Sequence, residues 1–258
     1  MLHYRQTDAN AQKTIVFLHA AGFDGRIWKP AAEQLSDFHC VCPDLPGHGQ
    51  SKQVPVSDFD AAGDAVAELI ESLGKGPVCL AGLSMGSYIG FRLLARHPHL
   101  VESAVFSGFQ HTPIQVSGVM RTLMHASSFM MNSRKNREKM ARSLGVNDPS
   151  LVSQRGGRPN ASSKTMRKIS ALALDFDASA ELQAIETPTL VLAGETEHAA
   201  IVSSLRTFQS AMPRCTARIV PRLGHGWIAT EPELFADILR AWFLQETLPE
   251  SLEALDEG

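Results

Sequence analysis

Short apolar runs rich in β-branched residues alternate with longer segments of helical spacing along most of this chain, and this alternation restricts the folds open to it. The six apolar runs lie at residues 14–18, 38–42, 77–81, 101–106, 189–193 and 217–220. The helical segments lie at 27–35, 58–73, 85–96, 199–212 and 231–244. A continuous apolar run of this length is typical of a parallel strand that is covered on both faces. Because strands that alternate with helices join through right-handed crossovers, we predict an α/β fold with a mostly parallel, doubly wound sheet.

The alternation stops once, between about residues 107 and 187. That stretch has helical patches rich in methionine and no clear strand. We therefore predict a helical cap at residues 109–186, inserted into an α/β core made of residues 1–108 and 187–245. Its methionines are expected to pack as the cap's own core rather than to line an adaptable pocket. Residues 246–258 are acidic and weakly apolar, so we expect this tail to fray.

Composition narrows the class of protein. Hydrophobic residues make up 44% of the 258 residues and charged ones 20%, the balance of an ordinary globular protein. The longest apolar runs fall far short of the ~20 residues of a membrane span, and the first residues lack the basic-then-apolar layout of a leader. We therefore expect a cytoplasmic protein without a membrane partner. The four cysteines have neither metal-ligand spacing nor the pattern of a disulfide framework, so no metal site is predicted.

Basic residues are concentrated in the predicted cap. The whole chain has a formal net charge of −3, whereas residues 109–174 hold eleven basic and two acidic side chains. Such a charge run is usually a solvated face, which is the interpretation we favour. The alternative is that it attracts an anionic substrate to the site. A nucleic-acid partner is not expected, because the basic excess is confined to the predicted cap and no aromatic platform is interleaved with it.

Gly82-Leu83-Ser84-Met85-Gly86 directly follows a predicted strand and opens the next helix. The pattern Gly-x-Ser-x-Gly needs small residues on both sides of the serine, because the chain turns sharply and holds the serine in a strained conformation with its hydroxyl exposed. A glycine-serine turn without chemistry is the other interpretation of these five residues. The strand before the turn and the helix after it favour catalysis, so Ser84 is the candidate nucleophile.

A serine nucleophile needs a base, because its hydroxyl is hardly ionised at neutral pH. His225, in Leu223-Gly224-His225-Gly226-Trp227, follows the last predicted strand and precedes the last helix. This placement puts it at the carboxyl edge of the strands, where Ser84 also lies. We therefore predict His225 as the general base. His19 and His48 lie in glycine turns near the same edge, and we expect them to support loop geometry.

Small residues also follow the first long strand, in His19-Ala20-Ala21-Gly22. They allow backbone N–H groups to approach a ligand. The N–H groups of Ala21 and Met85 would form an oxyanion hole, the second of them at the positive end of the helix after Ser84. A plain tight turn is the alternative interpretation of these four residues.

Together with Asp44-Leu45-Pro46-Gly47-His48-Gly49-Gln50-Ser51, these motifs resemble the α/β-hydrolase fold family over about residues 4–245. The chain looks most like small bacterial carboxylesterases and their relatives among C–C bond hydrolases and cofactor-free haloperoxidases. In this family the nucleophile, the acid and the histidine follow in that order. The resemblance places the acid at Glu197, where the family usually has aspartate. Glu195 is the nearest alternative, and Asp175 or Asp177 at the end of the cap is a more remote one.

The chain departs from the family pattern in further places. Ala20 stands where the family usually has glycine after histidine, and Ser87 stands where it usually has a second glycine. Both residues are small enough for the turns to form. Only about thirteen residues precede the first long strand, so one or both leading strands of the family's sheet are expected to be short or absent.

The resemblance implies a serine hydrolase that cleaves a carboxylic ester of a small molecule through an acyl-enzyme, with no metal or organic cofactor. Phe23, Trp28 and Trp227 stand next to the motif turns and are candidates for substrate contact. A C–C bond hydrolase or a thioesterase would use the same triad. A ligand receptor built on a hydrolase scaffold is the alternative from another class, because a fold does not by itself fix a function. The sequence predicts no oligomeric state.

Overall fold

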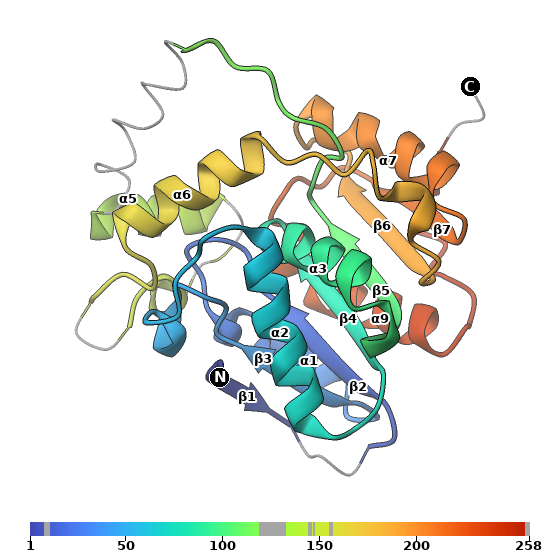
Figure 1. Cartoon of the computed structure of the whole chain (residues 1–258), viewed down its shortest axis with the longest axis horizontal. Helices are drawn as coiled ribbons and strands as arrows, with labels where there is room; N and C mark the ends of the chain where they lie inside the picture. Colours follow the sequence, from blue (N-terminus) through green and yellow to red (C-terminus); the bar gives the residue numbers. More distant parts are fainter. Residues whose placement is uncertain (8–10, 119–132, 144–145, 147, 155–156, 256–258) are drawn as a thin grey trace.

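The computed structural model describes residues 1–258 apart from 8–10, 119–132, 144–145, 147, 155–156 and 256–258. An eight-stranded sheet with the order β1-β3-β2-β4-β5-β6-β7-β8 lies at its centre (Figure 1). Neighbouring strands from β2 to β7 pair in parallel, whereas β1 and β8 pair antiparallel at the two edges. The predicted mostly parallel sheet is therefore confirmed. The strands are β1 (Tyr4–Gln6), β2 (Thr14–Leu18), β3 (His39–Pro43), β4 (Val78–Leu83), β5 (Val101–Ser107), β6 (Thr189–Gly194), β7 (Cys215–Val220) and β8 (Glu253–Ala254).

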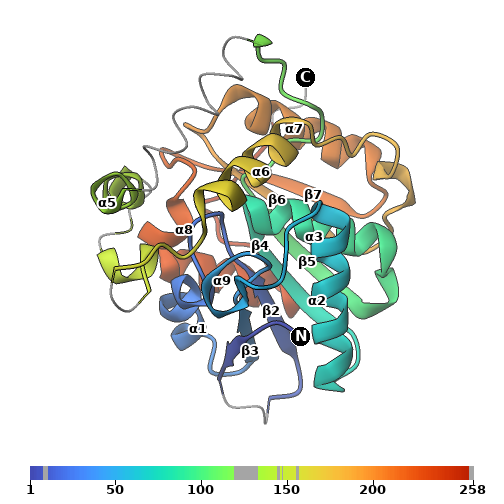
Figure 2. The same ribbon diagram turned by 60° about the vertical axis from the view of Figure 1, so that its left-hand side comes forward.

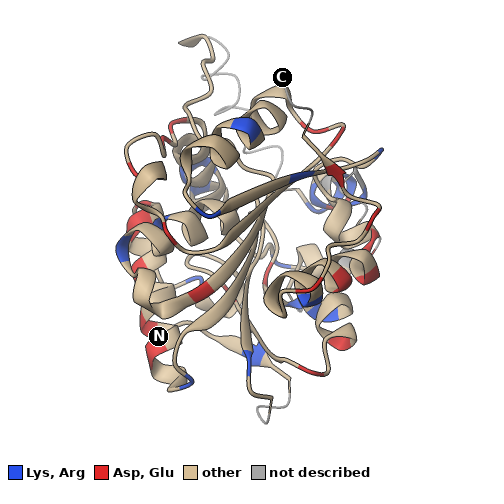
Figure 3. Cartoon of the chain, turned by 90° about the vertical axis from the view of Figure 1, so that its right-hand side faces the viewer, with Lys and Arg blue, Asp and Glu red and all other residues tan. Residues whose placement is uncertain are grey.

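The inner strands form where the sequence has continuous apolar runs. Every residue of β2, β3, β4 and β6 is buried, as expected for strands that are covered on both faces. The predicted runs differ from the observed strands by no more than two residues at either end. In Figure 3, the residues coloured as charged lie mainly on the covering helices and near the strand ends. Burial on both faces of the sheet thus accounts for the core.

Helices cover both faces of the sheet. One apolar cluster joins α2, α3 and α7 to one face, and a second joins α1, α8 and α9 to the other. The start and end of α2 have clear local causes, because the Asp58 carboxylate accepts a hydrogen bond from Ala61 N–H and Gly74 adopts a left-handed conformation. These helices are α1 (Lys29–Gln34), α2 (Phe59–Leu73), α3 (Met85–Arg96), α7 (Ala199–Ala211), α8 (Trp227–Thr230) and α9 (Pro232–Phe243). Short 3₁₀ turns are η1 (Gly25–Trp28), η2 (Gly49–Ser51), η3 (Pro98–Leu100) and η5 (Leu182–Ala184).

The segment between β5 and β6 contains α5 (Arg134–Ser143), the 3₁₀ turn η4 (Pro149–Val152) and α6 (Ser163–Leu174). Figures 1 and 2 show α5 and α6 outside the two helical layers. An isolated antiparallel bridge between Ala161 and His48 ties this segment to a core loop. Of the methionines in the predicted cap, Met120, Met124, Met130 and Met131 lie outside the described residues. The division into core and cap at residues 109–186 stays a prediction.

The sheet has a short strand at each edge. The leading strand β1 is present but has three residues, in line with the short first strand that we expected. The acidic tail, which we expected to fray, contains β8, whose residues Glu253 and Ala254 pair with Ile219 and Arg218 of β7. Leu252 is buried against the second apolar cluster, and Leu248 packs on its rim. Leu255 packs against the first apolar cluster, so three leucines anchor residues 246–255 of the acidic tail to the core.

All four cysteines are free, and Cys40, Cys42 and Cys79 are buried. Burial raises the pKa of the Cys79 thiol to about 11 and that of the Cys40 thiol to about 12, which keeps both thiols protonated and unreactive near neutral pH. Among the described helices, none has the length and apolar character needed to cross a bilayer.

Candidate active site

Ser84 lies at the turn between β4 and α3. Its backbone has φ 53° and ψ −115°, a strained conformation for a residue that carries a Cβ atom. Neighbouring backbone holds this turn in place: Ser84 N–H donates to Ser107 O at 2.9 Å, and Ser84 O accepts from Ser87 N–H at 2.8 Å. The strained turn that the sequence pattern predicts is therefore present in the structure.

The two glycines of the pattern are required by close packing. A Cβ atom on Gly86 would lie 2.0 Å from Leu18 O, at the end of β2. A Cβ atom on Gly82 would lie 3.0 Å from both Gly86 O and the Phe106 ring. Without side chains at these positions, the first turn of α3 presses directly on the strand that leads into the His19–Gly22 turn. The elbow and that turn are thereby held next to each other.

His225 lies on the loop between β7 and α8, and its Nδ1 is 2.7 Å from Glu197 Oε2. The other carboxylate oxygen of Glu197 accepts a hydrogen bond from Gly194 N–H at 3.0 Å. The Glu197 side chain is fully buried, whereas that of His225 is 33% exposed. A buried carboxylate on Nδ1 fixes the ring's orientation and favours the tautomer whose Nε2 can accept a proton.

Ser84 and His225 approach the same two residues at the end of β5. Ser107 O accepts from Ser84 N–H, and the His225 ring packs on Gly108, where a Cβ atom would lie 2.8 Å from His225 Cε1. Trp227, two residues after His225, donates from Nε1 to Ser107 Oγ at 3.0 Å. The structure therefore brings Ser84, His225 and Glu197 to one edge of the sheet.

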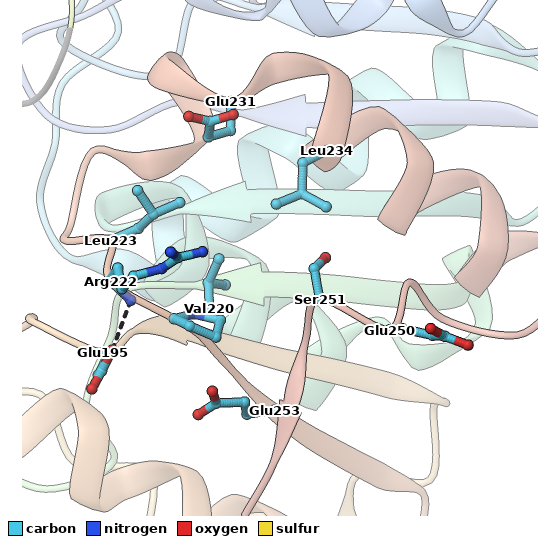
Figure 4. Close-up of a pocket in the computed structure, with 10 residues that line it drawn as sticks. Glu195, Val220, Arg222, Leu223, Glu231, Leu234, Glu250, Ser251 and Glu253 are labelled. Atoms are coloured by element: carbon cyan, nitrogen blue, oxygen red, sulfur yellow. Dashed lines mark hydrogen bonds between the residues drawn. The ribbon is translucent and has the colours of Figure 1, made fainter.

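Two of the alternative acids, Glu195 and Asp177, have other hydrogen-bond partners. Glu195 accepts from Arg222 N–H at 2.7 Å and faces a cleft of about 600 Å³ beside β7 and β8, which Glu231, Glu250 and Glu253 also line (Figure 4). Asp177, at the end of the predicted cap, accepts from Ser179 N–H at 2.9 Å. Of the four carboxylates that the sequence left open, Glu197 is the one that hydrogen-bonds His225.

The predicted oxyanion donors lie on the two neighbouring turns. Ala21 is half-buried in the turn after β2, and Met85 is the first residue of α3. Neither N–H donates a hydrogen bond to another group within the described part of the chain. Two free backbone donors, one of them at the positive end of a helix, are suited to a negatively charged oxygen.

Two buried histidines support the His19–Gly22 turn. His19 Nδ1 lies 2.9 Å from Ala20 O, and its Nε2 accepts from Leu45 N–H at 2.9 Å. His48 Nδ1 lies 2.9 Å from Pro46 O, and its Nε2 accepts from Gly22 N–H at 3.1 Å. Each ring must therefore be the neutral tautomer that carries its proton on Nδ1. Burial lowers the pKa of His19. Burial, and the repulsion that a protonated His19 would exert, lower the pKa of His48 to about 3.

Asp44 ties the same region together, a role that sequence reasoning missed. Its carboxylate is buried and accepts hydrogen bonds from Gly25 N–H, Gln50 N–H and the guanidinium of Arg5. Burial alone would raise the pKa of Asp44, but these donors hold it below its ordinary value. A Cβ atom on Gly49 would lie 2.3 Å from Asp44 Oδ2, so this position must be glycine. The presence of Gly49 in the Asp44–Ser51 motif is the sequence feature that could have indicated this role of Asp44.

The structure buries Phe23, Trp28 and Trp227, each with 1% of its surface exposed. Trp28 stacks on Phe235, and Trp227 meets the same ring edge-on. Trp28 also lines a cavity of about 250 Å³ whose described walls include neither Ser84 nor His225. All three side chains therefore pack within the fold, and their contact with a substrate stays a prediction.

The basic residues of the predicted cap are mostly exposed, as a solvated face would be. Arg137 is the buried exception, and its guanidinium donates to Val152 O and Gly157 O. Arg121 and Arg155 lie outside the described residues. No cluster of three or more His, Cys, Asp or Glu side chains within the described ranges could hold a metal ion. The exposed basic residues are Arg134, Lys135, Lys139, Arg142, Arg158, Lys164, Arg167 and Lys168.

Comparison with known proteins agrees with this geometry. The model of a family described as the alpha/beta hydrolase family matches residues 15–238. An AB hydrolase superfamily protein from Gibberella zeae is 27% identical over 266 residues, which cover 94% of this chain and 84% of that protein. A pimeloyl-[acyl-carrier protein] methyl ester esterase from Chromobacterium violaceum is 42% identical over 90 residues, which cover 34% of each chain.

The fold is also similar to solved structures. A thermophilic esterase from Thermogutta terrifontis superposes with a TM-score of 0.74 at 23% sequence identity, over 95% of this chain and 93% of that one. At this level of identity the likeness speaks for the fold alone. It agrees with the sheet order and with the two helical layers described above.

Proposed function

The chain belongs to the alpha/beta hydrolase family, and from that premise we propose that it is a serine esterase that cleaves a carboxylic ester of a small molecule through an acyl-enzyme. The observation that carries the proposal is the 2.7 Å contact between His225 Nδ1 and the buried Glu197 carboxylate. The His225 ring packs on Gly108, and the carbonyl oxygen of the preceding Ser107 accepts a hydrogen bond from Ser84 N–H. The similarity to a methyl ester esterase over part of the chain supports an ester as substrate.

Acylation uses each of these groups in one role. Ser84 Oγ attacks the ester carbonyl while His225 Nε2 takes up its proton, and Glu197 stabilises the imidazolium that forms. The carbonyl oxygen becomes negatively charged and is held by the N–H groups of Ala21 and Met85. When the tetrahedral intermediate collapses, His225 returns the proton to the departing alkoxide, which leaves as an alcohol.

Deacylation repeats the sequence with water in place of Ser84. His225 removes a proton from the water as it attacks the acyl carbonyl, and the same two N–H groups hold the oxyanion. The proton then passes to Ser84 Oγ as the carboxylic acid is released. None of these steps calls for a metal ion or an organic cofactor.

Replacing the nucleophile tests the proposal directly. Ser84→Ala should lower kcat/KM for short p-nitrophenyl esters by at least ~10³-fold, and a fluorophosphonate probe should label the wild-type chain at Ser84. Ser203, an exposed serine on α7, provides the matched control, since Ser203→Ala should leave both turnover and labelling unchanged. Undiminished turnover in Ser84→Ala would show that Ser84 is not the nucleophile. A wild-type chain that binds esters without turning them over would instead favour a receptor.

A further inference from the structure

Both backbone polar groups of Gly22 are hydrogen-bonded to side chains. Gly22 N–H donates to His48 Nε2 at 3.1 Å, and Gly22 O accepts from Asn160 Nδ2 at 3.3 Å. Gly22 itself has φ +83°, in the left-handed region that favours glycine. The Ala21 N–H belongs to the peptide plane of Ala20 O, which accepts a hydrogen bond from Phe23 N–H at 3.3 Å. Because Phe23 N–H and Gly22 O lie in one peptide plane, a partner that fixes Gly22 O also restrains the peptide that carries the Ala21 N–H.

Burial and hydrogen bonds hold the Asn160 side chain in place. Its side chain is 1% exposed, and Nδ2 also donates to Leu151 O at 2.7 Å. Its Oδ1 accepts from Arg26 Nη2 at 3.5 Å, and Arg26 is in turn held by the Asp24 carboxylate. Both amide hydrogens and the amide oxygen therefore have partners, so the side chain has one orientation rather than several.

Asn160 belongs to the segment between β5 and β6, whereas all its partners except Leu151 belong to the core. Its backbone O accepts from Gly49 N–H at 3.0 Å, next to the bridge between Ala161 and His48. The same segment reaches the core a second time through Gln154, whose Nε2 donates to Gly49 O. Asn160 thus touches the turn that carries Ala21, and Gln154 touches only the neighbouring loop.

We propose that Asn160 is a positioning residue for the oxyanion hole: together with His48 it clamps Gly22 and so holds the Ala21 N–H in the direction of the developing negative charge. The inference rests on the proposed esterase function. It also makes the position of this inserted segment a determinant of the catalytic rate, because the segment can leave the core only by releasing Gly22. A donor displaced by a fraction of an ångström acts on the transition state far more than on bound substrate.

The test compares two substitutions that remove side-chain contacts from the inserted segment to the core. Asn160→Ala deletes the contact with Gly22 and the longer one with Arg26, and Gln154→Ala deletes the contact with Gly49. We expect Asn160→Ala to lower kcat about tenfold with KM changed less than about twofold, a smaller loss than the 10²–10³-fold of deleting a donor outright. Gln154→Ala should change neither constant by more than about twofold. If Asn160→Ala fails to fold, the isosteric pair Asn160→Asp and Gln154→Glu repeats the comparison with equal changes of charge.

A second measurement does not depend on turnover. Amide hydrogen exchange of Gly22, followed by NMR, should accelerate about tenfold in the Asn160 variant and not in the Gln154 variant, because the clamp protects that N–H. Equal effects of the two substitutions on kcat, or unchanged exchange at Gly22, would overturn the inference. If the wild-type chain shows no Ser84-dependent turnover, the proposed function falls, and the exchange measurement alone decides whether Asn160 holds Gly22.

Discussion

At the scale of single residues, the proposed acid Glu197 shows how a longer side chain fits a position where the family resemblance predicts aspartate. Both oxygens of Glu197 are used, one by Gly194 N–H and the other by His225 Nδ1. The first of these bonds folds the side chain back on its own loop, which takes up the length of the extra methylene group. The carboxylate can therefore reach His225 while staying fully buried.

This geometry predicts a ranking among substitutions of the acid. Glu197→Gln should lower kcat/KM for esters by ~10³- to 10⁴-fold, because an amide no longer stabilises the imidazolium and can favour the wrong tautomer. Glu197→Asp should retain part of the activity. Glu195→Gln is the matched control two residues away, and it should stay near wild type because Glu195 bonds Arg222 N–H instead. Steady-state kinetics of the three variants checks this, and a larger loss for Glu195→Gln than for Glu197→Gln would reverse the assignment.

The sequence predicts a functional residue where that residue stands in a short local motif. Ser84 and His225 stand in glycine-flanked motifs at strand ends, and such motifs report the local turn directly. Asn160 carries no such mark, because its partner Gly22 is 138 residues away and the contact exists only after the chain has folded. The stacking of Trp28 was not visible in the sequence for a related reason, since the ring on which it stacks is supplied by the distant α9.

At the scale of elements, the contact between α3 and β2 limits what the elbow tolerates. Gly86→Ala places a methyl group 2.0 Å from Leu18 O, so the helix must move away from the strand. We expect a loss of at least ~2 kcal/mol in the free energy of unfolding, as for overpacking of a tight core, together with a drop in kcat. Gly74→Ala isolates the conformational cost, because Gly74 has φ +62° but no atom within 4 Å of the place that a methyl group would take; it should lose only ~1 kcal/mol. Urea unfolding of the two variants measures both, and equal losses would contradict the steric argument.

The sequence predicted those strands and helices that are long enough to show a hydrophobic pattern. The inner strands are five to seven residues long, and every residue of β2, β3, β4 and β6 is buried, which makes their apolar runs visible. By contrast, β1 has three residues and β8 has two, so neither has a pattern of its own. Both form because the edge of the sheet presents unpaired backbone N–H and C=O groups, with which a neighbouring segment can pair.

At the scale of the whole molecule, the buried histidines set how stability depends on pH. His48 has a pKa of about 3 when folded and an ordinary value near ~6.5 when unfolded. Between these values the unfolded chain binds a proton that the folded chain does not, so the free energy of unfolding falls as pH decreases. The buried His19 acts in the same direction. Above about pH 6.5 neither ring contributes a slope.

Urea unfolding at pH 7, 6 and 5 should therefore show stability falling by up to ~1.4 kcal/mol per pH unit for each of the two rings. His48→Gln, whose amide oxygen can still accept from Gly22 N–H, should flatten that slope by up to one proton. The exposed His99 offers a control, since His99→Gln should leave the steep acid dependence in place. A slope that is the same in the wild type and in His48→Gln would show that protonation of His48 is not what opens the fold in acid.

The two antiparallel edge strands also fix how the molecule can be joined to others. β1 and β8 occupy opposite edges of the eight-stranded sheet, and with neighbouring strands ~4.8 Å apart they are separated by roughly 33 Å. A circular permutant that connects the two must therefore bridge that span, which takes at least about ten extended residues. A domain fused ahead of β1 leaves the molecule on the far side from one fused after β8, so a donor and an acceptor fluorophore attached in these two places would report on the integrity of the entire sheet between them.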